Sequence, residues 1–150
     1  MTLRIPSALL ARIWQHGQLA YPEEGAGLML GRFDGEARVV THLLPLENHF
    51  QPESRGRRYL IAPRDLLRAE DDAERLGLEI VGVFHSHPDH PARASSFDTE
   101  WALPVYSYLI TQVQAARALE STCWRLAEDR ARMNEEALEI TDPAPSKEAS

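Results

Sequence analysis

Apolar residues follow two different spacings along this chain, and their alternation predicts an α/β domain. Two segments repeat apolar residues with helical spacing, and each begins with a proline that suits a first helical turn. Their predicted bounds are 6–17 and 63–77. Shorter apolar runs, typical of strands, occupy much of the remaining chain. The predicted strands are 27–32, 37–44, 58–62, 78–84, 106–113, 122–126 and 137–140.

Three local signals refine this pattern. Asp34-Gly35 separates the first two predicted strands and indicates a tight hairpin. The run 78–84 is apolar and β-branched, as expected of a strand buried on both faces, and it directly follows a helix. A last, short helix is predicted to begin at Ser95 or Ser96 and to run to about Leu103.

The chain has the length of one ordinary domain. It has 150 residues, of which 43% are hydrophobic and 26% are charged. This composition supports a hydrophobic core and excludes disordered and collagen-like classes. The predicted domain covers 1–140, and the polar residues 141–150 predict an unstructured tail. No internal repeat and no second domain are indicated.

The net charge of -7 arises from 23 Asp and Glu against 16 Lys and Arg. An acidic balance disfavours a nucleic acid as partner. The segment 128–150 holds seven acids against three cations, or -4 of the total, so the acidity says little about a substrate. Arg55, Arg57 and Arg58 form a basic cluster, which is either a solvated loop or a docking site for an acidic partner.

The single cysteine, Cys123, excludes a disulfide framework and any zinc site that needs two or more thiolates. Any metal ion must therefore be held by His and carboxylate groups. Arg4, Pro6 and Arg12 interrupt the first apolar residues before a signal peptide can form, and no later run approaches about 18 apolar residues. We therefore expect a soluble, cytoplasmic protein with no membrane partner. A homodimer is a further expectation, because small α/β domains often pair through exposed apolar strands.

The stretch FHSHPDHPARASSFD carries the candidate chemistry. Residues at i and i+2 of a strand share a face, so His85 and His87 can direct two imidazoles at one metal ion. Pro88 ends the strand, and the helix expected to begin after Ser95 places Asp98 in its first turn. Two imidazoles and one carboxylate suit a zinc ion whose fourth position is left to a catalytic water.

Hydrolysis at such an ion also needs a base. Glu23 and Glu24 are the candidates, because they precede the small residues Gly25, Ala26 and Gly27, which let backbones approach closely.

The order of these motifs resembles one family. P-x-E-x-x-G around Glu24, H-S-H-P sixty-one residues later and S-x-x-D beginning at Ser95 are similar to the motifs of the JAMM (MPN-plus) zinc metallopeptidases. The spacings match as well, and the resemblance extends from about Ile5 to Ile140. It implies a single α/β domain in which helices flank a curved mixed β-sheet, of the cytidine-deaminase-like kind.

The resemblance also implies a role for each residue. Glu24 becomes the acid/base, His85, His87 and Asp98 bind one Zn²⁺ per chain, and Ser95 donates to the oxyanion. Three further residues, with a place on the substrate side or in support of the ligands, are Asp89, His90 and Trp101.

Each residue also has a plainer interpretation when it is taken alone. Ser95-x-x-Asp98 fits a helix capping box, Glu24 fits a surface carboxylate, and His85 fits a hydrogen-bonded core histidine. H-x-H-x-D-H also fits the dinuclear metallo-β-lactamase-like hydrolases, but these need further histidines downstream, and the last histidine here is His90. The plain interpretations do not explain why all the residues fall at one family's spacing.

The family implies a substrate amide bond at the end of a ubiquitin-like protein. The short loop after His87 and the segment ALPVYSYLI look most similar to compact bacterial members, several of which are peptidases of sulfur-carrier proteins. The partner implied is a sulfur carrier with a Gly-Gly tail, from which cysteine or a short extension is released. One alternative is an isopeptidase that removes ubiquitin-like tags from lysines. Another is a non-catalytic MPN scaffold, which would have lost metal ligands.

Overall fold

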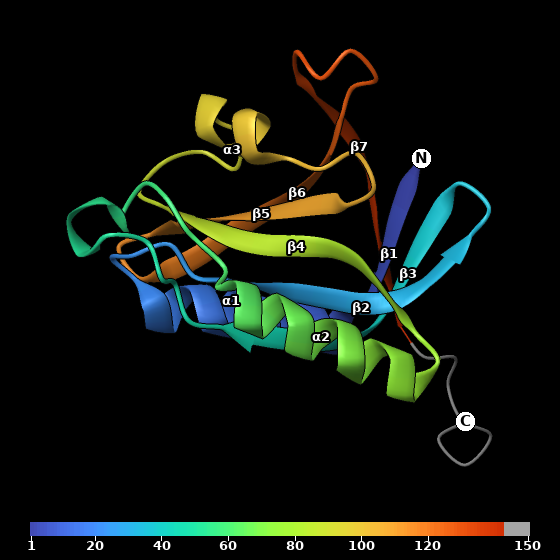
Figure 1. The fold of residues 1–150 in the computed structure, drawn as a ribbon. Coiled ribbons are helices and arrows are strands. Elements are labelled where there is room, and N and C mark those ends of the chain that lie inside the picture. The colour runs from blue at the N-terminus through green and yellow to red at the C-terminus, as the bar shows by residue number, and fades with distance from the viewer. Residues whose placement is uncertain (143–150) are drawn as a thin grey trace, which may run out of the picture.

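A computed structural model describes residues 1–142 and consists of one mixed β-sheet with helices on both sides (Figure 1). The strands are β1 (Thr2–Pro6), β2 (Ala26–Asp34), β3 (Ala37–Leu46), β4 (Glu79–Pro88), β5 (Ser107–Gln114), β6 (Arg117–Leu126) and β7 (Met133–Thr141). The helices are α1 (Ser7–Ala20), the 3-10 turn η1 (Pro52–Ser54), α2 (Pro63–Leu76) and α3 (Ser96–Trp101). The predicted α/β class with a mixed sheet is confirmed.

The sheet closes into a barrel, which the predicted elements did not include. Its strand order is β1-β3-β2-β4-β5-β6-β7, and β1 pairs in parallel with both β3 and β7. β1 is five residues long and lies directly before a helix, so its apolar alternation is too short to separate from the helical pattern. Leu3 and Ile5 of β1 are fully buried, because closure surrounds them with other strands.

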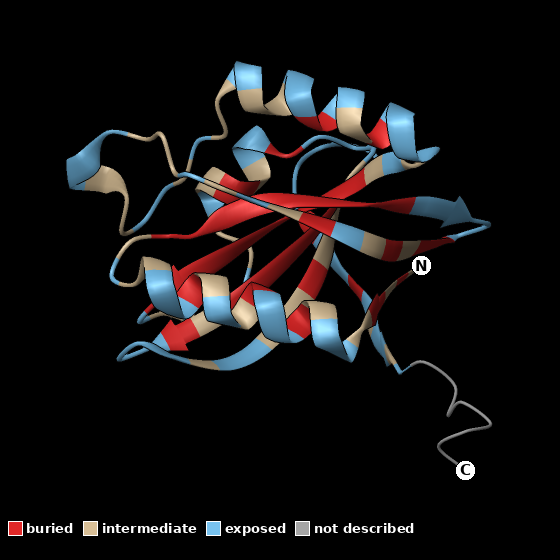
Figure 2. Cartoon of the chain, turned by 90° about the horizontal axis from the view of Figure 1, so that it is seen from below, coloured by how far each residue is buried: buried red, intermediate tan, exposed pale blue. Residues whose placement is uncertain are grey.

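Two helices cover opposite sides of the central strands, and Figure 2 shows the buried strands between two half-exposed helices. α1 buries Leu10 and Ile13 in a core shared with the strands of the barrel. α2 buries Ala69 and Ala73, and Ala69 belongs to a second core that includes Leu28, Val83 and Tyr108. α2 begins at Pro63 and ends at Gly77, which has a left-handed φ of 68°. These ends are as predicted.

Four predicted elements differ from the structure. Residues 58–62 form no strand, because the backbone amide of Leu60 bonds the side chain of Asn48 instead of a neighbouring strand. α1 continues past Gly17, which lies so close to β4 that an added Cβ would be 3.1 Å from Ser86 Cβ. β6 and β7 are longer than predicted, since their exposed faces are polar and hide the apolar alternation.

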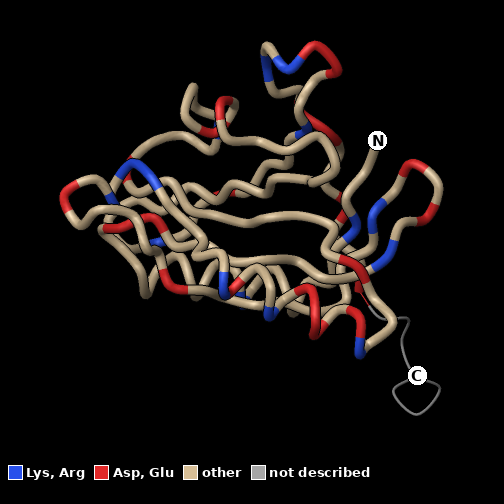
Figure 3. The backbone as a smooth tube through the Cα atoms, viewed as in Figure 1, with Lys and Arg blue, Asp and Glu red and all other residues tan. Residues whose placement is uncertain are grey.

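The end of the chain is only partly described. β7 includes Thr141, one residue beyond the predicted domain boundary. The rest of the predicted tail, 143–150, lies outside the described residues. In the described part of the chain, no helix combines the length and the apolar character needed to cross a membrane. Figure 3 shows the charged residues on α2, on the turns and near the chain ends, while the middle of β4 and β5 is free of them.

The strand register places the motif residues at one end of the sheet. β2 runs antiparallel to β4 with Ala26 opposite His85, so Gly25 and Glu24 continue toward the end of β4 that carries His87. A Cβ on Gly27 would lie 2.3 Å from the Phe84 ring and 2.6 Å from the carbonyl oxygen of Leu44. Only glycine therefore allows this approach of β2 to its neighbours, as the run of small residues predicted.

Candidate metal centre

The two histidines of the motif lie on one face of β4, as their i, i+2 spacing predicts. His85 and His87 are each 1% exposed, and the intervening Ser86 faces α1. Tyr59 stacks on the His85 ring with a centroid distance of 4.5 Å. The strand and this aromatic contact hold both imidazoles in place before any ligand binds.

Asp98 lies beside these two histidines, and the three side chains direct atoms that can coordinate a metal ion toward one another. We call His85, His87 and Asp98 the donor triangle. His85 Nε2 lies 3.2 Å from His87 Nε2 and 3.2 Å from Asp98 Oδ1, and His87 Nε2 lies 3.1 Å from Asp98 Oδ2. A tetrahedral zinc ion with bonds of about 2.0–2.1 Å has ligand atoms about 3.3 Å apart. The spacing of the two imidazole nitrogens and of the carboxylate oxygen that faces each of them therefore fits ligands of a single zinc ion.

The orientation of His87 suits a metal ligand. Its Nδ1 lies 2.8 Å from the carbonyl oxygen of Pro91, so a proton there leaves Nε2 of the neutral ring free to coordinate a metal ion. Without a metal ion, a second proton on Nε2 donates to Asp98 Oδ2, which lies 3.1 Å away. His85 Nδ1 is buried without a hydrogen-bond partner among the described residues. A cation at the centre of the triangle would satisfy the three facing atoms, so the residues fit a bound metal ion.

The first turn of α3 orients Asp98. Ser95 is the N-cap: its hydroxyl oxygen accepts from the Asp98 amide at 3.1 Å, and its own amide donates to Asp98 Oδ2 at 2.9 Å. The capping box is therefore present and at the same time points the carboxylate at the histidines. Burial acts to raise the pKa of Asp98, but His85, His87 and the Ser95 amide outweigh it and hold that pKa well below its usual range.

Glu24 faces the same site from the segment before β2. Ser86 fastens this segment, because its amide donates to the Gly25 carbonyl at 2.9 Å and its hydroxyl accepts from the Gly25 amide at 2.8 Å. Glu24 is 1% exposed, and its Oε1 has no partner in the described chain. Burial, with the charge of Asp98, raises the pKa of Glu24 to about 8, while His87 opposes the rise. A carboxyl group that titrates near neutral pH suits a general base and acid.

Asn48 was missed by the sequence analysis. Its side-chain amide donates to the carbonyl oxygens of Glu24 and Arg58, each at 2.9 Å, and its Oδ1 accepts from the amides of Phe50 and Leu60. The Glu24 amide in turn donates to the carbonyl of Arg55 at 2.6 Å. The arginine-rich loop therefore holds the backbone of Glu24 on both sides. No local pattern marks an asparagine that bonds residues so distant in sequence.

The three further candidates lie around this centre. Asp89 has a positive φ of 58°, accepts from the Ala115 amide and from the Tyr21 hydroxyl, and so joins the loop after β4 to the end of α1. His90 stacks on His87 with a centroid distance of 4.2 Å. Trp101 is 62% exposed and lies away from the donor triangle, at the edge of an apolar cavity.

This apolar cavity adjoins the metal ligands and has a volume of about 340 Å³. Tyr59, which stacks on His85, and Phe97, which precedes Asp98, belong to its wall. The guanidinium of Arg58 lies over the rings of Phe50 and Phe97, 5.9 and 5.2 Å from their centroids. The cavity therefore has an apolar wall and a cationic edge, and two of its wall residues adjoin the donor triangle.

Comparison with known proteins identifies the family. The profile described as "Prokaryotic homologs of the JAB domain" matches residues 6–127. The chain belongs to the prokaryotic JAB family. The resemblance to the JAMM/MPN-plus metallopeptidases and the prediction of an enzyme of that type are thereby confirmed.

Two curated members of this family are similar over much of the chain. A protein of Thermus thermophilus named "Probable TtuB-protein conjugate cleaving protease" is 35% identical over 79% of this chain and 75% of its own length. A protein of Haloferax volcanii named "Desampylase" is 36% identical over 59% of this chain and 62% of its own length.

Solved structures agree with the JAB fold. A solution structure of a protein from Desulfitobacterium hafniense is 29% identical, covers 94% of both chains and has a TM-score of 0.82. A JAB1/MPN domain protein from Archaeoglobus fulgidus is 21% identical, covers 95% of this chain and 100% of its own, and has a TM-score of 0.58. The second likeness concerns the fold alone, and it supports the MPN/JAB architecture.

Proposed function

We propose that this chain is a zinc-dependent peptidase that hydrolyses the amide bond following the C-terminal Gly-Gly of a ubiquitin-like protein. The observation that carries the proposal is the donor triangle of His85, His87 and Asp98 with the buried carboxyl group of Glu24 beside it. Zinc bound there would lower the pKa of a water molecule to roughly 7 and polarise the substrate carbonyl.

Glu24 would move the proton in this reaction. Its Oε1 is buried and unpartnered, so it is free to accept a proton from the attacking water and to pass it to the departing amine. The bonds from Asn48 and Arg55 to its backbone prevent the segment from shifting during this transfer. The Glu24 carboxyl group lies beside His87 and so adjoins the three proposed zinc ligands, but it is not itself one of them.

Ser95 would stabilise the developing oxyanion. Its hydroxyl oxygen already accepts from the Asp98 amide, so the hydroxyl proton remains free to donate toward the site. The capping and catalytic interpretations of Ser95 are therefore compatible.

The cavity next to the ligands supports the substrate class. An extended tail whose last residues are glycines can pass close to the metal, and an apolar residue before them can enter the cavity of about 340 Å³. The relative named for cleaving TtuB-protein conjugates favours a lysine side chain of a second protein as the leaving group. The sulfur-carrier substrate, with cysteine or a short extension as leaving group, is the second candidate, because the loop from His87 to Asp98 is short, as in the compact bacterial members that the sequence resembles.

The test is hydrolysis of two substrate sets by the zinc-loaded protein, followed by intact mass. One set consists of ubiquitin-like proteins joined through Gly-Gly to a lysine of a second protein; the other consists of carriers extended by cysteine or a short peptide. Release of the second protein, which leaves a ubiquitin-like protein with a free Gly-Gly end, supports the isopeptidase activity. Removal of the cysteine or short peptide from the extended carriers, with no cleavage of the lysine-linked set, supports the carrier peptidase.

Glu24→Gln supplies the matched control. It removes the acid/base group but not a ligand, so we expect it to bind zinc and to lose hydrolysis by about 10³-fold or more. Cleavage by this variant at the wild-type rate would overturn the role of Glu24. Stoichiometric zinc with no hydrolysis of either set by the wild type would favour the non-catalytic scaffold instead.

A further inference from the structure

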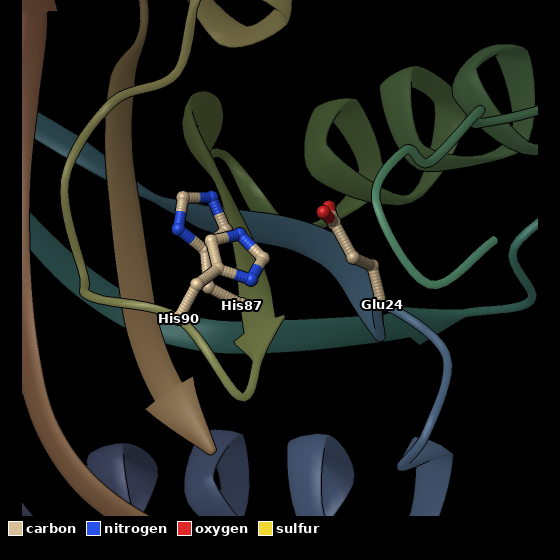
Figure 4. A group of neighbouring side chains, drawn as sticks. All are labelled: Glu24, His87 and His90. Carbon is tan, nitrogen blue, oxygen red and sulfur yellow. The ribbon is translucent and has the colours of Figure 1, made fainter. Parts of the chain in front are cut away.

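A second group of possible metal ligands lies beside the donor triangle. Glu24, His87 and His90 each offer one ligand atom, and these atoms lie within 4.8 Å of one another. Figure 4 shows the two imidazoles stacked face to face, with the Glu24 carboxylate extending next to them from the neighbouring segment. His90 is not needed for the proposed hydrolysis, so its position in this group calls for its own explanation.

His90 is oriented as a ligand. Its Nδ1 lies 2.8 Å from the carbonyl oxygen of Pro88, which places the proton there and leaves the lone pair on Nε2. Stacking on His87, with 21° between the ring planes, holds the imidazole in place. Glu24 contributes a buried carboxyl oxygen that no described residue satisfies.

We propose that Glu24 and His90 form a second, weaker zinc site, and that its occupation inhibits the enzyme. His87 Nε2 belongs to the donor triangle, so a second ion would have Glu24 and His90 as its protein ligands and water at its other positions. Two protein ligands bind more weakly than three. The ligand atoms of Glu24 and His90 lie within 4.8 Å of each other, whereas ligands of one zinc ion lie about 3.3 Å apart. Binding of the second ion therefore also requires a small side-chain movement.

Inhibition follows because Glu24 would be both the acid/base of hydrolysis and a ligand of the second ion. The inhibitory effect therefore rests on the proposed function. A carboxylate bound to a cation is no longer available to accept a proton. The site would therefore make hydrolysis depend on free zinc, with activation at one equivalent and inhibition in excess.

The test is a zinc titration of metal-free protein, by equilibrium dialysis with elemental analysis. We expect the wild type to bind two ions, the second at least 100-fold more weakly than the first. His90→Gln and Glu24→Gln should each keep the first ion and lose the second. His42→Gln changes an exposed histidine outside the site and should still bind two. A second ion retained by His90→Gln, or a wild type that binds one ion even at millimolar zinc, would refute the site.

Hydrolysis provides the second measurement, each variant being compared with its own rate at one equivalent of zinc. Wild type and His42→Gln should be inhibited by excess zinc, whereas His90→Gln should need at least tenfold more zinc for the same inhibition. Equal inhibition of all three proteins would contradict the inhibitory role. If no substrate is cleaved at any zinc concentration, the proposed function fails, while the zinc titration still decides whether the second site exists.

Discussion

The molecule contains two buried polar clusters, at opposite ends of the parallel pair β4 and β5. One is the donor triangle next to Glu24. The other, the Glu136 cluster, consists of Arg38, Ser107, Cys123, Arg125 and Glu136. Ser107 pairs with Gly82 and Gln112 pairs with His87, so five residues, or about 17 Å of strand, separate the two ends.

The clusters differ in how their polar atoms are satisfied. In the Glu136 cluster, Arg38 donates to Ser107 at 2.8 Å, while Ser107 and the Cys123 thiol donate to Glu136 Oε1 at 2.7 and 3.1 Å. Arg125 forms an ion pair with the same carboxylate. Burial raises the pKa of the Cys123 thiol well above its usual value, so the thiol remains a donor. Arg125 Nε and Glu136 Oε2 have no hydrogen-bond partner in the described chain, but they face each other as an ion pair, so opposite charges within the cluster balance one another.

The donor triangle has the opposite property. Two imidazole nitrogens and a carboxylate converge on one point, and Glu24 Oε1 and His85 Nδ1 have no partner in the described chain. A fold tolerates such an arrangement where a ligand completes it. A self-satisfied cluster therefore indicates a structural role, and an unsatisfied one indicates a binding site.

The largest expected effect is a loss of zinc affinity, which we expect from a change in the donor triangle and not from one in the Glu136 cluster. His87→Ala removes a ligand that no other described residue replaces, so zinc affinity should fall at least 10³-fold and hydrolysis should be lost. The melting temperature of the metal-free protein should fall as well, because the variant loses the hydrogen bond to Pro91 and leaves a cavity at a buried position, so the loss of zinc affinity is the distinguishing effect. Zinc titration and circular dichroism measure the two quantities. Wild-type zinc affinity in this variant would show that the triangle is not the metal site.

Glu136→Gln tests the other cluster. It leaves the buried Arg38 and the partly buried Arg125 without their counter-charge, so the free energy of unfolding should fall by about 3–5 kcal/mol, as measured by denaturant titration. Zinc stoichiometry should remain that of the wild type. A loss of zinc without a loss of stability would reverse the roles that we assign to the clusters.

The pH dependence of metal-free protein provides a third test. The pKa of Glu24 is raised by burial from 4.5 to about 8, so the folded state holds this proton more tightly than the unfolded state. Its stabilising effect is complete below about pH 4.5 and is lost as the pH rises toward 8. Glu24→Gln should therefore become more stable relative to wild type over this interval, by about 2–4 kcal/mol. A stability difference independent of pH would mean that the pKa of Glu24 is the same in the folded and unfolded states.

The smallest effect concerns the anchoring of Glu24. Asn48→Ala removes four hydrogen bonds, one to the carbonyl oxygen of Glu24 and three to backbone groups of Phe50, Arg58 and Leu60. We expect kcat to fall about tenfold, or about 1–2 kcal/mol in barrier height, with KM changed less than about twofold. Asn134→Ala, at an exposed position, serves as the control. A rise in KM alone would assign Asn48 to substrate binding instead.

Local patterns predicted the parts of the site that lie close together in the sequence. The i, i+2 spacing placed His85 and His87 on one face, and the capping signal placed Asp98 in the first turn of α3, as the structure has them. Glu24 is different, because no local pattern distinguishes it from Glu23. Its assignment came from the family resemblance, and its place opposite His87 comes from the register between β2 and β4.

The sequence by itself determined the α/β class, the two long helices, the strands other than β1, the family and the residue types suited to a metal ion, because these depend on periodicity, caps and short spacings. Only the tertiary structure decided the closure of the barrel by β1, the anchoring of Glu24 by Asn48, and the contrast between a satisfied and an unsatisfied polar cluster. These features join residues that are far apart in the chain, and a hydrogen bond or a missing partner exists only when the folded backbone has brought them together.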